Sequence, residues 1–401
     1  MLKEKKVTHV VEEYLRICED CGTPYFTAGE QAFYENKNLT LPKRCKKCRT
    51  ARKQEWEKEQ KAKKLIEHAE FFKQALIAAP FKSVSIGSFP TGDPPVTLNI
   101  IGNGFDLMHS VKSSYYNFRD SLGKNNSLRF ALETYLNVED VWADFEDALA
   151  HINSGAMFEV IDMWLDDFNA YDPDAQAADF FAAVDAATGP SQTITNDLPR
   201  RFRMWVESLK VPDMAYRPLN GVVCNSNTLN FNYTEFIEEL YGVEKENICY
   251  IHGCRRKEKY HPKDKLILGH VPGAGDDDLV GDYRLPKYKN SRKREMVEAA
   301  IDTAARNLSW YDAETTKNCK DIIKNNQEFF DGLSNVGRII IVGHSLSPVD
   351  WDYFKKIINV NKSKKNIEWF ISCRSARNIE SIKMFADAMD IKADQITLFI
   401  T

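Results

Sequence analysis

The chain has 401 residues, of which 43% are hydrophobic and 28% charged, a composition typical of a globular protein with one large domain and accessory parts, or with two domains. Its net charge of −4 excludes a protein that binds nucleic acid over its whole surface. No apolar run approaches the roughly 20 residues of a membrane span, and no apolar signal segment follows the N-terminus, so we expect a cytoplasmic protein with no membrane partner.

Two Cys-x-x-Cys pairs near the N-terminus, Cys18 with Cys21 and Cys45 with Cys48, have the spacing of a metal site. Four thiolates form the soft, tetrahedral donor set of a structural Zn²⁺ site. A segment this short cannot bury a core of its own, so the metal would supply its folding energy. We therefore predict a zinc ribbon over residues 1–55 whose metal is not catalytic. Two redox-active or merely reduced cysteine pairs are the alternative.

The sequence around these cysteines, at residues 25–34 and 42–49, resembles a family of bacterial zinc ribbons. The resemblance implies a structural zinc but no particular ligand. A basic cluster lies on and after the second pair, with aromatic residues nearby: Lys43, Arg44, Lys46, Lys47, Arg49, Arg52 and Lys53. Basic side chains with stacking rings can bind single-stranded nucleic acid. A solvated charged face is the alternative.

A long helix is predicted over residues 50–79, where apolar residues form an interrupted stripe. Pro80 and the Ser/Gly/Pro-rich residues 83–95 then predict a linker. We therefore expect a connecting helix and linker over residues 56–95, followed by the main domain over residues 96–401.

The main domain opens with residues 96–101, an apolar run typical of a strand buried on both faces. Gly102-Asn103-Gly104 follows, and its glycines permit unusual backbone angles and the close approach of a ligand. A helix is expected next, whose first N–H groups favour a phosphate. This order predicts a nucleotide site, although the third glycine of the dinucleotide fingerprint is absent. A tight turn without a ligand is the alternative.

Residues 127–190 are predicted to be mainly helical, Gly189-Pro190 to break the pattern, and residues 197–210 to form another helix. We thus expect a helical insertion at about residues 120–210. Its acidic residues are expected on a solvated face: Glu139, Asp140, Asp144, Glu146 and Asp147.

Further apolar runs predict strands at residues 228–231, 248–253, 266–270, 338–345, 367–372 and 396–400, with helices at 235–241 and 349–360. This alternation predicts the α/β fold class: a Rossmann-like parallel sheet with a helical insertion, plus the small N-terminal zinc ribbon. Polar residues at strand ends should meet in one crevice: Asn103, Asp106, Asn232, His252, His270 and His344. A lone histidine there is more often structural, but three of them favour at least one catalytic histidine.

An ordered set of motifs resembles the bacteriophage abortive-infection AbiH family over about residues 96–401. The motifs lie at residues 100–107, at Trp142 with 145–146, and at 229–234, 251–253, 268–270 and 343–347. The resemblance implies an antiphage role, in which a phage-derived trigger activates the protein and host growth stops before phage matures.

The same order of motifs is more distantly similar to the sirtuin-type NAD-binding fold. That resemblance implies dinucleotide contacts by Gly102, Asn103, Gly104 and Phe105, and ribose contacts by His344 and Ser345. Asn103 and His344 depart from the sirtuin pattern, which has alanine and threonine there. The N-terminal position of the ribbon departs from it too. A protein deacylase is therefore disfavoured, and NAD hydrolysis is expected.

Three residues are the candidates for that chemistry. Asn232 would orient the attacking water or a ribose hydroxyl. The sirtuin-type resemblance implies a general base at His252, which would accept a proton because imidazole titrates near neutral pH. Asp106 would stabilise positive charge on the ribosyl ring, or would only cap a helix.

Two other functions remain open for this sequence. One is a non-catalytic nucleotide sensor whose partner delivers toxicity. The other is a nucleic-acid-binding defence protein that uses Arg44, Lys46, Lys47 and Arg49 of the ribbon. A homo-oligomer is compatible with each of them.

Overall fold

The computed structural model describes residues 14–86, 96–165, 173–211, 219, 222–223, 226–256, 266–273, 291–362 and 366–401. The chain divides into two compact units, Met1–Ile77 and Ala78–Thr401. Within the described ranges, no helix combines the length and apolar character needed to cross a membrane.

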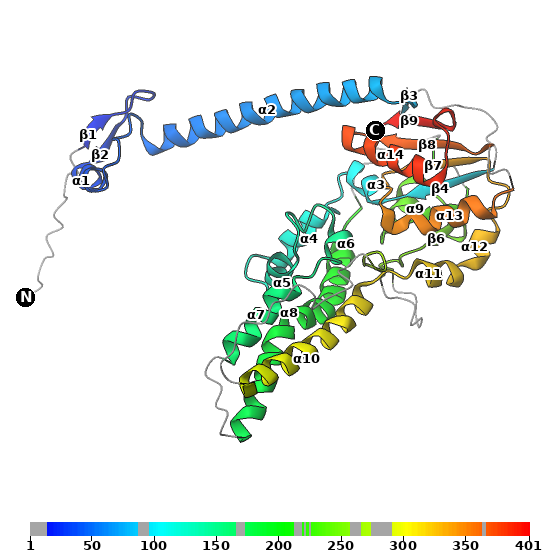
Figure 1. The fold of residues 1–401 in the computed structure, drawn as a ribbon. Coiled ribbons are helices and arrows are strands. Elements are labelled where there is room, and N and C mark those ends of the chain that lie inside the picture. Colours follow the sequence, from blue (N-terminus) through cyan, green and yellow to red (C-terminus); the bar gives the residue numbers. More distant parts are fainter. Residues whose placement is uncertain are drawn as a thin grey trace, which may run out of the picture. The chain divides into compact units, whose positions relative to one another are not determined.

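The first unit consists of a hairpin and two helices (Figure 1). Strands β1 (Tyr14–Ile17) and β2 (Pro24–Thr27) pair antiparallel, and α1 (Ala28–Asn36) follows directly. Thr27 and Glu30 form a capping box, in which each side chain accepts the backbone N–H of the other. The predicted long helix is confirmed as α2 (Lys46–Ala78), all of whose residues are described and none of which is buried. The helix begins at Lys46, four residues before the predicted start at residue 50, and therefore between Cys45 and Cys48.

The second unit is organised around a seven-stranded parallel sheet (Figure 1). Its strands are β3 (Lys82–Ser85), β4 (Thr97–Ile101), β5 (Thr228–Asn230), β6 (Ile248–Tyr250), β7 (Arg338–Val342), β8 (Glu368–Cys373) and β9 (Ile396–Ile400). Their order is β3-β9-β8-β7-β4-β5-β6, with every neighbouring pair parallel. Without β3, this is the order of doubly wound dinucleotide-binding sheets, counted from β4. The predicted Rossmann-like fold class is confirmed, and the order reverses between β4 and β7.

Helices follow the strands or form the insertion. Those between β4 and β5 are α3 (Asn103–Met108), α4 (Tyr115–Leu122), α5 (Ser127–Tyr135), α6 (Phe145–Ala148), α7 (Ser154–Trp164) and α8 (Pro173–Ser208). The later ones are α9 (Phe236–Tyr241), α10 (Ser291–Thr315), α11 (Cys319–Asn325), α12 (Gln327–Asp331), α13 (Trp351–Val360) and α14 (Ala376–Met389). Because α5, α7 and α10 all pack on α8, the helical insertion also includes a segment from after β6 (Figure 1).

The break predicted at Gly189-Pro190 is wrong, because α8 continues through Pro190 and Pro199. A proline inside a helix removes one backbone hydrogen bond and costs about 3 kcal/mol. The apolar side of α8 offsets this cost through burial against its helical neighbours; it includes Ala183, Val184, Ala187, Ile194, Leu198 and Phe202.

Two other local predictions are also wrong. Residues 83–85, predicted as part of a linker, belong to β3, a mostly exposed edge strand that lacks the apolar signal of an inner strand. The strand predicted at residues 266–270 does not form: Ile267 donates its N–H to the carbonyl of His252, and His270 makes an isolated bridge to Thr316. The apolar character of residues 266–270, which suggested a strand, is explained by packing: Leu266 belongs to the hydrophobic core cluster.

The turns after β4 and β7 are in direct backbone contact. Gly104 donates its N–H to the carbonyl of Gly343 at 2.7 Å. Gly343 has a φ of +67°, and a Cβ on it would lie 2.1 Å from the nitrogen of Phe105. Gly102 has an ordinary φ of −124°, and its Cβ would lie 2.6 Å from the Cα of His344. Gly102 and Gly104 are therefore needed for contact between two turns, and the predicted reason, unusual backbone angles, is wrong.

We expect Gly343→Ala to lower the free energy of unfolding by about 3 kcal/mol or more, because the methyl group would collide with the turn after β4 and the positive φ would be strained. Gly189→Ala is the matched control, since open space surrounds Gly189 within α8 and alanine favours helix by about 1 kcal/mol. Chemical denaturation of the two variants measures the difference. Wild-type stability of Gly343→Ala would contradict the contact.

Candidate functional site

A cavity of about 990 Å³ lies at the carboxyl ends of the parallel strands. It sits where the strand order reverses between β4 and β7, which is where doubly wound sheets bind ligands. Its volume is at the upper end of the range for small-molecule and cofactor sites, about 300–1,000 Å³. The predicted site residues that line it are Gly102, Asn103, Gly104, Asp106, Asn232, His252, His344 and Ser345.

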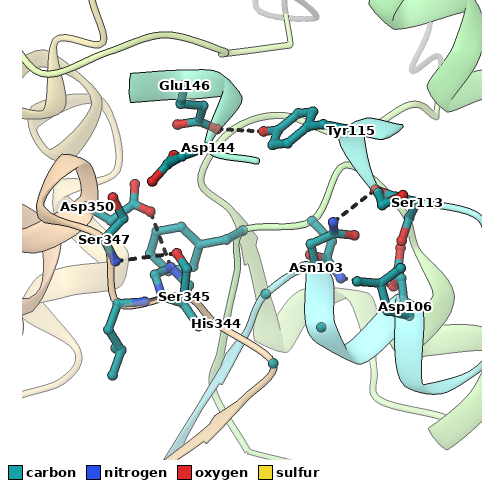
Figure 2. A pocket seen from close by; sticks show the side chains of 18 of the residues that line it. Asn103, Asp106, Ser113, Tyr115, Asp144, Glu146, His344, Ser345, Ser347 and Asp350 are labelled. Atoms are coloured by element: carbon teal, nitrogen blue, oxygen red, sulfur yellow. Dashed lines mark hydrogen bonds and ion pairs between the residues drawn. The ribbon is translucent and has the colours of Figure 1, made fainter. Parts of the chain in front are cut away.

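Two carboxylates in the cavity wall share a buried cation (Figure 2 shows Glu146 and Asp350). The side chain of Lys317, between α10 and α11, is 0% exposed, and its Nζ bonds Glu146 Oε2 and lies 3.3 Å from Asp350 Oδ1. Burial opposes the charge on Lys317, but Asp350 and Glu146 outweigh it and raise the pKa of the amine above its usual value. Tyr115 donates its hydroxyl to the other oxygen of Glu146 at 3.1 Å. The three charges thus form one hydrogen-bonded group.

The same carboxylate of Asp350 faces two histidines. Its Oδ2 lies 3.3 Å from Nε2 of His344, whose Nδ1 accepts the N–H of Leu346 at 2.9 Å. This bond places the proton of neutral His344 on Nε2, toward Asp350 (Figure 2). Burial by itself would raise the pKa of Asp350, but Lys317 and the two histidines hold it well below its usual range. Asp350 is therefore an anion that organises the groups around it.

His252 differs from His344 in having a ring nitrogen without a bond. Its Nε2 is 3.6 Å from Asp350 Oδ1, which is beyond hydrogen-bond distance, and it has no partner among the described residues. Burial, helped by the Lys317 charge, lowers the pKa of His252 well below its usual value. The imidazole is therefore neutral at pH 7 and has an unused polar atom.

Asp106 and Asn232 form a second buried group. Asp106 Oδ1 accepts from Asn232 Nδ2 at 2.9 Å, and its Oδ2 accepts from the hydroxyl of Thr234 at 2.8 Å. Burial raises the pKa of Asp106 to about 7, although the bonds from Thr234 and Asn232 oppose the shift. Asn232 also donates its backbone N–H to Asn230 at 2.9 Å. These bonds fix the amide of Asn232 and leave its Oδ1 for another donor. Asp106 does not cap α3, whose N-cap is Gly102.

The glycine turn does not offer its N–H groups to a ligand as predicted. Gly102 donates to the carbonyl of Val342 at 3.0 Å, Gly104 to Gly343, and Phe105 to Gly102 at 2.9 Å. The expected pyrophosphate contact through these N–H groups is therefore wrong. The side chain of Phe105 is buried in the core cluster and is not part of the cavity wall, so its predicted ligand contact stays a prediction without support from this geometry.

Several functional candidates escaped the sequence analysis. Glu146 and Asp144, predicted on a solvated face, both line the cavity. The prediction is wrong for Glu146, whose side chain is mostly buried, whereas Asp144 is exposed as predicted. The four-residue helix α6 is too short for its periodicity to reveal an inward side. Asp350 lies six residues after His344, a signal that could have been used, whereas nothing in the sequence distinguishes Lys317 from the many exposed lysines. His270 is buried elsewhere, beside Thr315.

The four predicted cysteine ligands come together in the first unit. The sulfurs of Cys18, Cys21, Cys45 and Cys48 all lie within 4.8 Å of one another, and those of Cys21 and Cys45 are 3.8 Å apart. A tetrahedral ion with metal–sulfur bonds of about 2.3 Å requires sulfur separations of about 3.8 Å, so the cluster fits a metal such as Zn²⁺. The carboxylate of Asp20, which lies between the first two cysteines in the sequence, forms ion pairs with Arg44 at 2.8 Å and with Arg52 at 3.0 Å. These two arginines therefore connect the two halves of the metal site.

A parallel sheet in doubly wound order, with a ligand-sized cavity at its reversal point, defines the second unit as an α/β protein of the nucleotide-binding type. Residues 98–373, more than half of the chain, match the family model described as Bacteriophage abortive infection AbiH. The chain belongs to the AbiH family. Residues 14–57 match the model of a Probable treble clef domain. No curated protein and no solved structure matches the chain.

We expect Cys45→Ser to remove one bound Zn²⁺ per chain and to expose residues 14–57 to proteolysis, because the metal replaces a core in this unit. Metal analysis combined with limited proteolysis measures both effects. Cys254→Ser is the control, since Cys254 lies outside the cluster. Full zinc occupancy in Cys45→Ser would contradict the site.

Proposed function

We propose that the protein is an antiphage effector that binds NAD in this cavity and hydrolyses its N-glycosidic bond. The observation that carries the proposal is the buried Nε2 of His252, which has no hydrogen-bond partner among the described residues of a cavity wall. Leaving a buried polar atom unpaired costs free energy, and such atoms recur where a ligand or a reaction uses them. Membership of the AbiH family supports the antiphage role.

The choice of a dinucleotide is supported by topology, volume and charge. Doubly wound sheets of this strand order bind dinucleotides across their reversal point, and about 990 Å³ is enough space for one. The glycine turn cannot hold the pyrophosphate with N–H groups that are already bonded. Arg374 and Arg377 line the cavity beyond β8 and are the proposed partners of the phosphates. The distant sirtuin resemblance of the motifs points to the same ligand.

In the proposed reaction, a water attacks C1′ of the nicotinamide ribose. The bond from C1′ to the nicotinamide nitrogen breaks, and its electron pair neutralises the pyridinium ring. The His252 imidazole takes the proton of the water, and Asp350, 3.6 Å from its Nε2, stabilises the imidazolium that forms. Asn232, fixed by Asp106, accepts a hydrogen bond from the water or a ribose hydroxyl. The products are nicotinamide, ADP-ribose and a proton.

We expect His252→Gln to slow nicotinamide release about 100-fold or more while NAD still binds, because glutamine cannot take the proton of the attacking water. Nicotinamide is measured with and without phage lysate, and the same variants are scored for protection of cells. His151→Gln is the control, since His151 is outside the cavity wall. Wild-type protein that binds NAD and leaves it intact under both conditions would refute the hydrolase and favour a nucleotide sensor.

We further propose that the first unit binds single-stranded nucleic acid through one face of α2. Residues 14–77 contain 14 Lys and Arg against 9 Asp and Glu, whereas the whole chain has a net charge of −4. Trp56 is 59% exposed on this polar helix. On the same face, three and four residues apart, lie Arg49, Lys53, Gln60 and Lys63. Cations around an exposed aromatic ring suit backbone phosphates and a stacked base. Arg44, part of the set predicted from the sequence, instead pairs with Asp20.

We expect Trp56→Ala to weaken binding of a fluorescent 20-nucleotide oligonucleotide about tenfold, because a stacked base is worth about 1–3 kcal/mol. Fluorescence anisotropy at several salt concentrations measures affinity and its electrostatic component. Trp310→Ala is the control, since Trp310 is similarly exposed in the second unit. Equal affinity of Trp56→Ala and wild type would contradict the proposed face.

A further inference from the structure

Lys317 is the most deeply buried charge of the site, yet the proposed reaction does not use it. Its side chain is 0% exposed, and it lies behind the cavity wall rather than in it. A buried ion pair contributes little to stability compared with apolar residues of similar volume, because both charges lose their hydration. Stability alone therefore does not explain a lysine at this position.

The geometry connects Lys317 to His252 through one oxygen atom. Oδ1 of Asp350 lies 3.3 Å from Nζ of Lys317 and 3.6 Å from Nε2 of His252. Oδ2 of the same carboxylate faces His344 at 3.3 Å, and Glu146 bonds the amine from the other side. A proton on His252 would therefore place a second positive charge beside Oδ1 of Asp350, whose negative charge is already paired with the Lys317 ammonium.

We propose that Lys317 is a positioning residue that keeps His252 a neutral base by occupying the oxygen of Asp350 that the two side chains share. Burial and the Lys317 charge both lower the pKa of His252, while Asp350 opposes them, in agreement with this geometry. If the amine were absent, Asp350 would stabilise the imidazolium more strongly and the histidine would take up a proton at a higher pH. The charge of Lys317 would then decide whether a base is available at neutral pH.

Among the residues that the structure describes, the titratable groups that face His252 are compatible with this assignment. Besides Lys317 and Asp350, His344 faces it from the turn after β7. Tyr233, after β5, and Tyr353, on α13, have ring centroids 6.3 Å and 5.8 Å from the imidazole. Burial raises the pKa of both tyrosines, so they stay neutral. Lys317 is thus the cation whose removal changes the charge near His252.

The inference rests on the proposed function only for the catalytic role of His252 as a base. Its test measures the protonation of His252 and therefore does not require NAD. In the full chain labelled with ¹⁵N-histidine, the signal of His252 is identified by its loss in His252→Gln and followed through a pH titration. The double variant Glu146→Gln/Lys317→Met removes the buried pair as a unit. We expect it to raise the pH at which His252 titrates by at least about one unit, a tenfold change in its proton affinity.

Two further variants make the comparison specific. Lys317→Arg keeps the charge and should keep the wild-type titration, and Lys320→Met removes an exposed lysine nearby and should change nothing. Glu146→Gln/Lys317→Gln replaces the methionine variant if that one does not fold. An unchanged titration of His252 in the folded double variant would overturn the inference, whether or not the protein cleaves NAD. A shifted titration without NAD cleavage would uphold the inference and refute the proposed reaction.

Discussion

The carboxylate of Asp350 is the constraint on which the site depends. A buried anion must be paired, and here one carboxylate is shared by Lys317, His252 and His344. These partners come from three separate segments, namely those that follow α10, β6 and β7, and Asp350 itself precedes α13. The pairing of Lys317 with Asp350 and Glu146 and the contact of His344 with Asp350 hold these segments together, because moving the lysine or Asp350 away would leave a buried charge without its partner. The cavity wall is therefore fixed by electrostatics as well as by apolar packing.

The sheet places this carboxylate and the second group, Asp106 with Asn232, in the wall of the same cavity. Strands β4 and β7 are neighbours although more than 200 residues separate them, and their following turns are in contact through Gly104 and Gly343. This contact leaves no space for a side chain and uses the N–H groups that a phosphate would otherwise bind. The turn thus has a structural role, and the proposed ligand contacts lie in the polar side chains around it. The glycine-rich motif resembles that of a dinucleotide site but works by a different physical mechanism.

Much of the fold could be predicted from the sequence. Strands β4, β7, β8 and β9 are apolar runs of the right length, and the four cysteines have the spacing of a metal site. The errors arise where tertiary packing outweighs local signals. Pro190 is tolerated because the apolar side of α8 is buried, and β3 is a short edge strand held by its pairing with β9.

The site could be predicted only in part, for a related reason. Polar residues directly after strands, such as Asn232 and His252, are brought together by the parallel sheet and can be found from the pattern. Glu146 and Lys317 lie on helices or in connections of the insertion, where sequence periodicity does not show which side faces the sheet. Their role depends on a three-dimensional meeting of charges that no local pattern encodes.

Calorimetric titration of NAD into the purified full chain tests most directly whether this cavity binds one adenine dinucleotide. We predict saturable binding of one NAD per chain, retained in His252→Gln because the base is needed for the reaction and not for affinity. No saturable binding at millimolar NAD would contradict it.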